Sequence, residues 1–369
     1  MDERERSIRA CKDERAFFAA ANSGEGFKSF YGEIFSPERL LRRYLIKGGP
    51  GTGKSSLMRR VAGEAEKRGY GVEYYRCSSD PTSLDAILIG GRVALIDSTA
   101  PHAIEPELVG ARDEIVDLGI FWNSASLRER VGEIEALANE KSARYRAAYR
   151  YLEAAEVLDR RSREVVAPYV KREKLKRAAE RLVATLPMGD GYRYRTGICS
   201  SIGMKGRHRL DFYENAAEKI YAVRDAMSVG SLFLAAIADA AVAKRASIVV
   251  SYDPINLSSP DAILFEDSRV AFVLCARDES DCFGDKLVAT VNAKRFLSHD
   301  VSTEKGRRAK AEYRFDRRER EAMIDSACEQ LSLAGKAHFS LEKIYGESMD
   351  FAALERFTKS LAVAICDSL

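Results

Sequence analysis

The sequence predicts an α/β fold, with mainly parallel sheets flanked by helices, that is built twice along the chain. Short apolar segments alternate with segments of helical periodicity, which is typical of parallel strands joined by helices. A glycine-rich loop joins one of these strands to the helix that follows it. Several segments of the first half also recur, in the same order, in the second half.

The internal repeat covers most of the chain. Four pairs of segments match in order and spacing, namely 15–26 with 195–206, 30–31 with 212–213, 43–69 with 219–245, and 85–88 with 261–264. Agreement in both order and spacing predicts a duplication. The first copy is expected at about residues 13–190 and the second at 191–369.

The first copy shows the expected order of elements. Residues 44–47 form a short apolar strand, after which the glycine-rich loop begins. Residues 54–68 carry apolar side chains at helical spacing, and Gly69 is a suitable C-cap. Further strands are expected at 72–77, 86–89 and 92–97.

After Trp122 the sequence changes to long, charged helical segments. Residues 124–186 are expected to form two helices separated at Pro168. The second copy ends in similar segments, around 317–332, 337–345 and 351–365. We therefore expect a helical hairpin to close each copy by packing on its own domain. The expected divisions of the chain are 1–123, a helical hairpin at 124–190, the second copy at 191–300 and a helical segment at 301–369.

Composition and charge argue against several classes of protein. The net charge of +3 is small for 369 residues, so nucleic acid is not an expected partner. Residues 305–320 are basic, but interleaved acidic residues favour a solvated segment. The charged N-terminus is no secretory signal, and no apolar run reaches the ~18 residues of a membrane span. Seven cysteines without a C-x-x-C pair indicate reduced thiols in a cytoplasmic protein.

The glycine-rich loop is the strongest functional signal. It fits the pattern G-x-x-x-x-G-K-[ST] at every fixed position and lies between a strand and a helix. Glycines let consecutive backbone N–H groups turn towards an anion, and the N-terminus of the helix adds positive charge. The expected nucleotide-binding residues are Gly48, Gly49, Pro50, Gly51, Thr52, Gly53, Lys54, Ser55 and Ser56.

Polar residues after the loop predict a triphosphate with a metal ion. Lys54 would place its charge on the β- and γ-phosphates, and the Ser55 hydroxyl would ligate Mg²⁺. Asp97, at the end of an apolar strand, would hold the same ion through a water molecule. Asp80 is a weaker candidate for the metal or for a catalytic base. Together these residues predict a site for ATP and Mg²⁺, without fixing the base preference.

The sequence leaves the catalytic base open. Many ATPases of this kind carry a glutamate directly after the metal-binding aspartate, but Ser98 stands there. His102, or Glu114 on an expected helix, is a candidate to orient the nucleophile. The missing glutamate also leaves room for a kinase. The lack of N-K-x-D and L-S-G-G-Q segments counts against a GTPase and a transporter ATPase.

The second copy lacks the residues that would bind a triphosphate. Residues 224–231 stand in the place of the loop and contain no lysine. Met227 and Val229 replace glycines, so their side chains would crowd the phosphate. Asp225 would repel it.

The second copy therefore needs another role. Leu274 or Cys275 stands where the strand-ending aspartate would be. We expect this copy to be regulatory or structural, to hold a partner, or to supply Arg207 or Arg209 to the γ-phosphate of the first site.

Five segments resemble an uncharacterised bacterial family of ATP-binding P-loop proteins that is common in Firmicutes. They lie at 17–31, 45–56, 77–81, 94–102 and 341–351, so the resemblance spans nearly the whole chain. It implies a duplicated P-loop NTPase fold with helices after each copy, and an ATPase or ATP-binding protein of no settled substrate. The site residues that match are those of the loop and Asp97, with Asp80 and His102 in the flanking segments. The degenerate loop of the second copy puts a two-site mechanism in doubt.

Three functions follow as hypotheses. The first is a cytoplasmic ATPase with one working site, in which hydrolysis drives a rearrangement between the copies. The second is a kinase that transfers the γ-phosphate to a small molecule or nucleotide. The third is a signalling module in which bound ATP is the signal for a partner and turnover is negligible.

Overall fold

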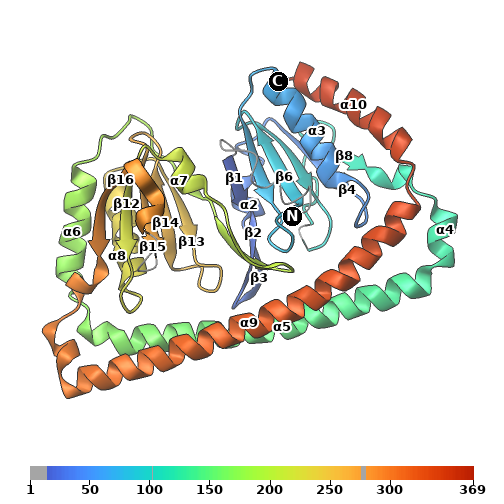
Figure 1. The fold of residues 1–369 in the computed structure, drawn as a ribbon. Coiled ribbons are helices and arrows are strands. Elements are labelled where there is room, and N and C mark those ends of the chain that lie inside the picture. The colour runs from blue at the N-terminus through green and yellow to red at the C-terminus, as the bar shows by residue number, and fades with distance from the viewer. Residues whose placement is uncertain (1–14, 102, 276–279) are drawn as a thin grey trace.

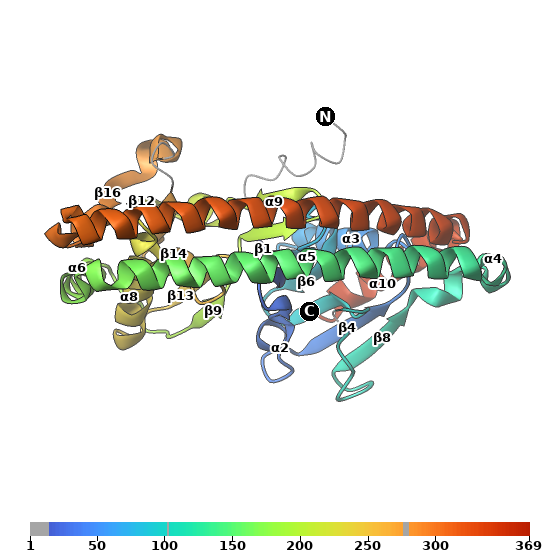
Figure 2. The ribbon, with the colours of Figure 1, turned by 90° about the horizontal axis from the view of Figure 1, so that it is seen from below.

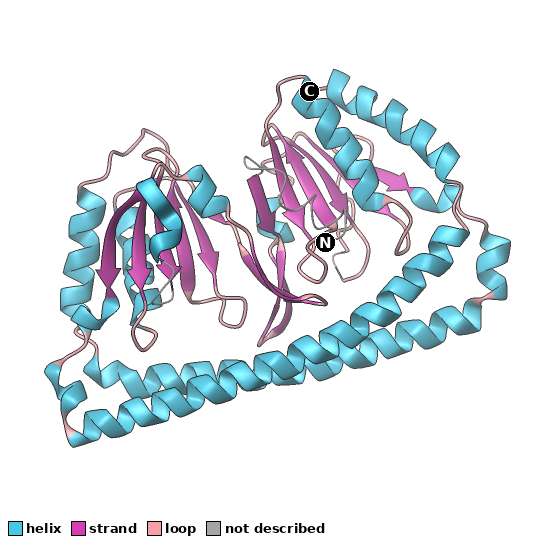
Figure 3. Cartoon of the chain, in the orientation of Figure 1, coloured by secondary structure: helices cyan, strands magenta, loops and turns pink. Residues whose placement is uncertain are grey.

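The computed structural model describes residues 15–101, 103–275 and 280–369. The chain forms two α/β domains that stand side by side on a long arm of two helices (Figure 1). Strands are confined to the domains and to the hairpins between them, whereas the arm is helical throughout (Figure 3). The α/β class predicted from the sequence is confirmed.

In the described part of the chain, the first sheet has six strands in the order β1-β5-β6-β7-β4-β8. They are β1 (Arg15–Phe18), β4 (Arg42–Lys47), β5 (Val72–Arg76), β6 (Leu84–Ile89), β7 (Val93–Asp97) and β8 (Asp113–Asp117). β4 is parallel to both of its neighbours, but β6 is antiparallel to β5 and β7. The sheet is therefore mixed, but only β6 runs against the other five described strands, which are parallel to one another as expected. The connections on either side of β6 are too short for the crossover of a dozen or more residues that parallel strands need.

The second sheet repeats this arrangement. Read in the corresponding direction, its order is β9-β13-β14-β15-β12-β16, with the same parallel and antiparallel pairs. The strands are β9 (Tyr194–Thr196), β12 (Lys219–Arg224), β13 (Ile248–Tyr252), β14 (Pro260–Phe265), β15 (Val270–Cys275) and β16 (Leu287–Asn292). The register repeats as well, since Arg42 lies opposite Val93 and Lys219 opposite Val270. Shared order, direction and register support the duplication predicted from the sequence.

Each sheet is covered by the helix that follows its central strand. α3 (Lys54–Lys67) buries an apolar stripe that includes Leu57, and α8 (Val229–Ala243) buries one that includes Phe233. Smaller elements also occur in pairs: α2 (Tyr31–Ile34) with α7 (Phe212–Ala216), and the hairpin β2 (Ala20–Ser23)–β3 (Gly26–Ser29) with β10 (Ser200–Gly203)–β11 (Gly206–Arg209). After β8 come η1 (Leu118–Phe121) and α4 (Ser124–Glu129), and around β16 lie η3 (Ser280–Lys286), η4 (Ala293–Phe296) and η5 (His299–Ser302).

The helices that follow each copy cross to the other copy. α5 (Val131–Val166) and α9 (Glu304–Glu347) run antiparallel along the molecule and form the arm (Figure 2). α5 leads through η2 (Ala167–Tyr169) into α6 (Arg172–Ala184), which packs on α8 of the second copy. α9 leads into α10 (Phe351–Asp367), which packs on α3 of the first copy. This arrangement corrects the expectation that a helical hairpin closes each copy on its own domain.

Helix length and apolar burial explain the exchange. The 36 residues of α5 span roughly 54 Å at 1.5 Å per residue, which exceeds the diameter of a small domain. The next helix is thereby carried to the neighbouring core. α6 buries Leu175 and Val183 with the core of the second copy, and α10 buries Leu354 and Ile365 with that of the first. The helix break at Pro168 is confirmed.

Equivalent backbone hydrogen bonds stabilise the two places where a helix of one copy reaches the other copy. At one crossing the Asn123 N–H donates to the carbonyl oxygen of Ser348 over 2.7 Å. At the other the Ser298 N–H donates to the carbonyl oxygen of Tyr169 over 2.8 Å. The two crossings are therefore related by the same pseudo-twofold symmetry as the sheets.

The small hairpins are exchanged in the same way. The Met204 N–H, at the tip of β10–β11, donates to the Ser79 carbonyl oxygen of the first copy over 2.7 Å. The Gly24 N–H, at the tip of β2–β3, donates to the Ile255 carbonyl oxygen of the second copy over 3.4 Å. Each copy thus contributes backbone to the loop after β5 or β13 of the other.

α9 is one continuous helix where the sequence suggested separate segments. It begins at a Thr303 cap, whose hydroxyl accepts from the Gly306 N–H, and it includes the basic segment 305–320. Basic side chains there pair along the helix, as Arg308 does with Glu304. Among the described residues, no helix combines the length and apolar character of a membrane span.

The arm contains its own apolar seam, and truncation there should be costly. Leu152 of α5 is fully buried with Leu331 of α9, so Leu152→Ala should lower the free energy of unfolding by about 2–5 kcal/mol. Val157→Ala, on the same helix at a side chain that is 54% exposed, should change it by less than about 0.5 kcal/mol. Urea unfolding measures both, and equal effects would contradict the packing described for the arm.

Candidate functional site

The glycine-rich loop lies between β4 and α3 at the carboxyl end of β4. Most of its residues are partly exposed, so the loop is neither extended nor buried. Gly51 and Gly53 have φ angles of 68° and 87°, which residues with a Cβ rarely adopt. Gly53 is the N-cap of α3 and provides no side-chain acceptor for the first turn.

Lys54 spans the space between the loop and the end of β7. Its ammonium group donates to the carbonyl oxygens of Gly48, over 3.0 Å, and Gly49, over 2.6 Å. The Lys54 Nζ also lies 3.6 Å from Oδ2 of Asp97, and both side chains retain some exposure, at 12% and 13%. Asp97 ends β7, which is parallel to β4 and adjacent to it. The structure therefore brings Lys54 and Asp97 together as the sequence predicted.

The hydroxyl groups of the loop are held by backbone contacts. Thr52 is buried and its hydroxyl donates to the Gly49 carbonyl oxygen over 2.8 Å. The Ser55 Oγ accepts from the Leu84 N–H over 3.1 Å. Within the described residues, no group of three or more His, Cys, Asp or Glu side chains could hold a metal ion. A magnesium ion that takes most of its ligands from phosphate and water needs no such group.

The end of the arm packs against the loop. A Cβ added at Gly51 would lie 2.4 Å from the Glu342 carbonyl oxygen of α9, and one at Gly49 would lie 2.8 Å from the Tyr345 ring. A Cβ at Gly53 would lie 2.8 Å from the Leu354 side chain of α10. The glycines thus have a second role, because they allow α9 and α10 to approach the backbone.

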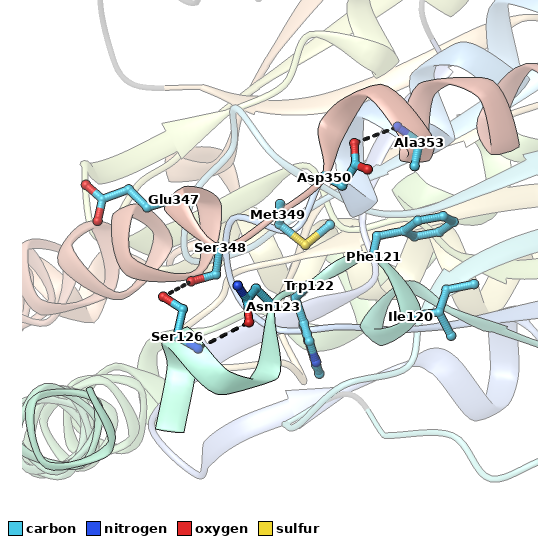
Figure 4. A pocket seen from close by; sticks show the side chains of 10 residues that line it. All are labelled: Ile120, Phe121, Trp122, Asn123, Ser126, Glu347, Ser348, Met349, Asp350 and Ala353. Carbon is cyan, nitrogen blue, oxygen red and sulfur yellow. Dashed lines mark hydrogen bonds between the residues drawn. The ribbon is translucent and has the colours of Figure 1, made fainter. Parts of the chain in front are cut away.

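A pocket of about 440 Å³ lies where η1 and α4 meet the junction of α9 and α10 (Figure 4). Tyr345 connects the pocket to the loop, because a Cβ at Gly49 would lie 2.8 Å from the Tyr345 ring, and that ring's centroid is 6.0 Å from the ring of Trp122. The aromatic rings of Phe121 and Trp122 are among its lining side chains. The pocket therefore joins residues of the first copy to the last two helices of the chain.

Asp80 is at the end of β5, but a residue of the second copy neutralises it. Lys205, at the tip of the β10–β11 hairpin, places its Nζ 3.0 Å from Oδ1 of Asp80. Burial alone would raise the pKa of Asp80, but hydrogen bonds from Thr82 and Lys205 outweigh it and lower that pKa. A carboxylate with a lowered pKa is a poor general base.

Glu114, the other candidate base among the described residues, is not brought to Lys54, and Ser98 does not replace the missing glutamate. Ser98 is buried, and its hydroxyl both donates to the Ile104 carbonyl oxygen and accepts from the Ile104 N–H. Glu114 is exposed on the edge strand β8, opposite Tyr44 in the middle of β4, and not on a helix as expected. His102 lies outside the described residues.

Sequence reasoning missed a buried carboxylate next to Asp97. Asp85 precedes Ala86 on β6, and Ala86 lies opposite Ile96, the neighbour of Asp97. Burial above all raises the pKa of Tyr31, and both Asp85 and Asp97 raise it further. Asp85 is the first residue of one of the repeated segments of the sequence, and this repetition is the signal that could have identified it.

The second copy fills its own loop with a carboxylate. Asp225 Oδ1 accepts from the Gly230 N–H over 2.7 Å, and Oδ2 accepts from the Ser228 N–H over 3.1 Å. These amides open α8, where an anion would otherwise bind. Asp225 thus excludes a phosphate by occupying its place, in addition to the repulsion expected from the sequence.

The loop of the second copy is also shorter, so the ungapped alignment is wrong at this point. Ser228, with a φ of 59°, is the left-handed N-cap of α8 and corresponds to Gly53. The register of the strands also decides which residue replaces Asp97. Leu274 lies opposite Val223 as Asp97 lies opposite Ile46, so the replacement is Leu274 and not Cys275.

Neither proposed arginine points to the first site. Arg207 pairs with Glu321 and Asp325 of α9. Arg209 stays within the second copy, where it pairs with Glu214 over 2.9 Å. From this hairpin it is Lys205 that reaches the first copy.

No family model, no curated protein and no solved structure matches this chain. The resemblance to bacterial P-loop proteins therefore stays a prediction.

The Asp225 carboxylate should stabilise the second copy as an internal cap. Asp225→Ala leaves the first amides of α8 without their acceptor, so the free energy of unfolding should fall by about 1 kcal/mol. Asp239→Ala, at an exposed position of the same helix, is the matched control and should change it by less than about 0.5 kcal/mol. Guanidinium unfolding of the two variants measures the difference, and an Asp225 variant as stable as the control would disprove the cap.

Proposed function

We propose that this chain binds ATP with Mg²⁺ at residues 48–56 and hydrolyses it at this single site. The observation that carries the proposal is the placement of Lys54 between the glycine-rich loop and Asp97, on neighbouring parallel strands. A strand, a G-x-x-x-x-G-K-S loop and a helix in this order, next to a strand that ends in aspartate, support a P-loop NTPase fold. The antiparallel strand β6 lies on the other side of β7 and does not change the arrangement of β4, the loop, α3 and β7.

The electrostatics of the loop favour a polyphosphate. Loop amides and the N-terminus of α3 provide partial positive charge, and Lys54 adds a full charge. The Ser55 hydroxyl and the Asp97 carboxylate are the oxygen ligands that magnesium prefers. In this proposal Lys54 contacts the β- and γ-phosphates, while Ser55 and Asp97 hold the ion that offsets the charge of the phosphates.

The neighbouring pocket suits the rest of a nucleotide. Tyr345 links it to the loop, and Phe121 and Trp122 offer aromatic surface for a purine ring. Polar groups such as Asn123 and Ser126 also line it and could orient a ligand.

The second copy contributes structure to this site and no second nucleotide. Asp225 occupies the corresponding anion position, and Leu274 stands in place of the metal-binding aspartate. Its hairpin still reaches the first copy through Lys205. A stoichiometry of one nucleotide per chain follows from the proposal.

A second candidate function is a nucleotide-dependent switch with little turnover. It is favoured by the state of the groups around Asp97: the Ser98 hydroxyl is fully used, and Lys205 neutralises Asp80. A site that binds the nucleotide while these groups, among the described residues, are engaged elsewhere would hydrolyse it slowly. Phosphate release without an added acceptor separates this candidate from the first.

Lys54→Ala should weaken Mg-ATP binding about 10- to 100-fold, because charge-assisted hydrogen bonds of about 1.5–3 kcal/mol are lost. Isothermal titration calorimetry measures the affinity. Lys67→Ala removes an exposed lysine at the other end of α3 and should bind as the unchanged protein does. If Lys54→Ala keeps the original affinity, the proposed site is wrong.

Asp97→Asn should reduce the dependence of binding on magnesium. With the carboxylate intact, we expect Mg²⁺ to strengthen ATP binding several-fold relative to an excess of EDTA, because the ion links Asp97 to the phosphates. In the asparagine variant the two conditions should give similar affinities. A variant with the full magnesium effect would remove Asp97 from the metal site.

A further inference from the structure

We propose that Lys141, on the α5 helix of the arm, is a second phosphate-binding residue that contacts the terminal phosphate of the nucleotide held by Lys54. This inference rests on the proposed nucleotide site and adds to it a cation from outside the α/β domain. The arm would then take part in the site in addition to covering it.

The helical position of Lys141 directs it towards the first copy. Tyr145 and Tyr149 follow at intervals of one helical turn, so the three side chains lie on one face of α5. The Tyr145 hydroxyl donates to the Ser79 Oγ over 2.8 Å, and the Tyr149 hydroxyl donates to Asn22 Oδ1 over 2.9 Å. Because α9 contacts the loop at Gly49 and Gly51, this face of the arm continues past Lys141 towards the loop.

The charge of Lys54 opposes the charge of Lys141. Lys141 is half-buried, and burial first, then the charge of Lys54, lowers its pKa. Among the residues that the structure describes, no carboxylate forms an ion pair with Lys141, and none contributes to this shift. Two cations in a partly desolvated place are stabilised by an anion between them.

In the second copy, the basic residue at the corresponding position of the arm is neutralised by carboxylates of the chain. The arm pairs Leu152 of α5 with Leu331 of α9 in one apolar cluster, and Arg320 precedes Leu331 by the same interval as Lys141 precedes Leu152. Arg320 is buried, and its Nη2 lies 3.0 Å from Asp253 Oδ2. Its Nε lies 3.4 Å from Asp159 Oδ1.

The first copy lacks both of these carboxylates. The N–H of Cys77 donates to the Ser83 carbonyl oxygen as that of Asp253 donates to Ser259, so Cys77 holds the place of Asp253. His338 of α9 follows Leu331 by the same interval as Asp159 follows Leu152, so His338 holds the place of Asp159. In the second copy, carboxylates of the chain pair with the arginine of the arm. In the first copy, the positions that correspond to these carboxylates are Cys77 and His338, so the lysine of the arm has no such partners there.

Asp225 completes this comparison. In the second copy it occupies the anion position at the helix N-terminus, whereas Gly48 stands at the corresponding position of the first copy. All three internal anions of the second copy are therefore missing from the first. An anion of several charges, such as a polyphosphate, would replace them together.

The terminal phosphate is the one that Lys141 would meet. Loop amides of this motif surround the inner phosphates, and the lysine of the loop marks the β- and γ-phosphates. Lys141 belongs to the arm, whereas the carbonyl oxygens that Lys54 contacts belong to the loop. Loss of the γ-phosphate on hydrolysis would therefore release the arm lysine and leave the loop contacts in place.

The test compares ATP and ADP binding in two variants of the full chain. Lys141→Gln should weaken Mg-ATP binding about tenfold or more, as expected for a lost charge-assisted hydrogen bond, and change Mg-ADP binding less than threefold. Arg146→Gln, an exposed position on the same helix, removes the same charge and should leave both affinities unchanged. Lys141→Arg should keep most of the ATP preference. Calorimetric titration gives all these affinities.

Thermal unfolding without nucleotide provides a second readout. Removing a lysine that repels Lys54 should leave the midpoint unchanged or raise it, and the stabilisation by Mg-ATP should shrink. A lowered midpoint, a failure to fold, or equal losses for ATP and ADP would overturn the inference and make Lys141 a structural residue. If the unchanged protein binds no Mg-ATP, the proposed function itself fails, which is a different result.

Discussion

The antiparallel packing of α5 on α9 is the contact on which the rest of the molecule depends. Its apolar seam, which includes Leu152 and Leu331, places the last helix of each copy on the core of the other. α9 of this arm contacts the loop after β4 and, through Tyr313, the loop after β12. It therefore decides which residues face the loop after β4 and which face the loop after β12. Without the arm, each domain would lose a covering helix, and the first copy would also lose the contacts of α9 with its glycine-rich loop.

The two copies share a backbone plan but balance charge differently. In the second copy, carboxylates of the chain satisfy the helix N-terminus and the arginine of the arm, as Asp225 and Asp253 show. In the first copy, glycine and cysteine occupy those positions, and Lys54 lies 3.6 Å from Asp97. A duplicated domain can lose a ligand without losing stability if side chains of its own replace the ligand's charges. In the first copy, no side chains replace these negative charges at the corresponding positions, so a bound ligand such as the proposed nucleotide would supply them.

Much of the fold and the phosphate loop could be predicted from the sequence, but the exchange of helices could not. Strands, the loop and the break at Pro168 follow from local patterns, and the structure has them within a few residues. The mixed sheet was also foreseeable, because the segments beside β6 are visibly too short for a crossover. Helical periodicity, in contrast, shows that α6 and α10 have a buried face and gives no information on which core receives it. Lys141 was invisible for a related reason, since on a helix as charged as α5 only the tertiary position of a lysine distinguishes it.

The exchange of α6 and α10 has a consequence for how the chain is made. A ribosome releases the first copy long before α10 exists, so α3 and the glycine-rich loop emerge with their outer surface uncovered. The second copy, by contrast, meets α6 as soon as it is synthesised, because α6 precedes it. Leu354 can therefore reach Gly53 only after both sheets have been synthesised. In this architecture the candidate site of the first copy is completed only once the second copy has been made.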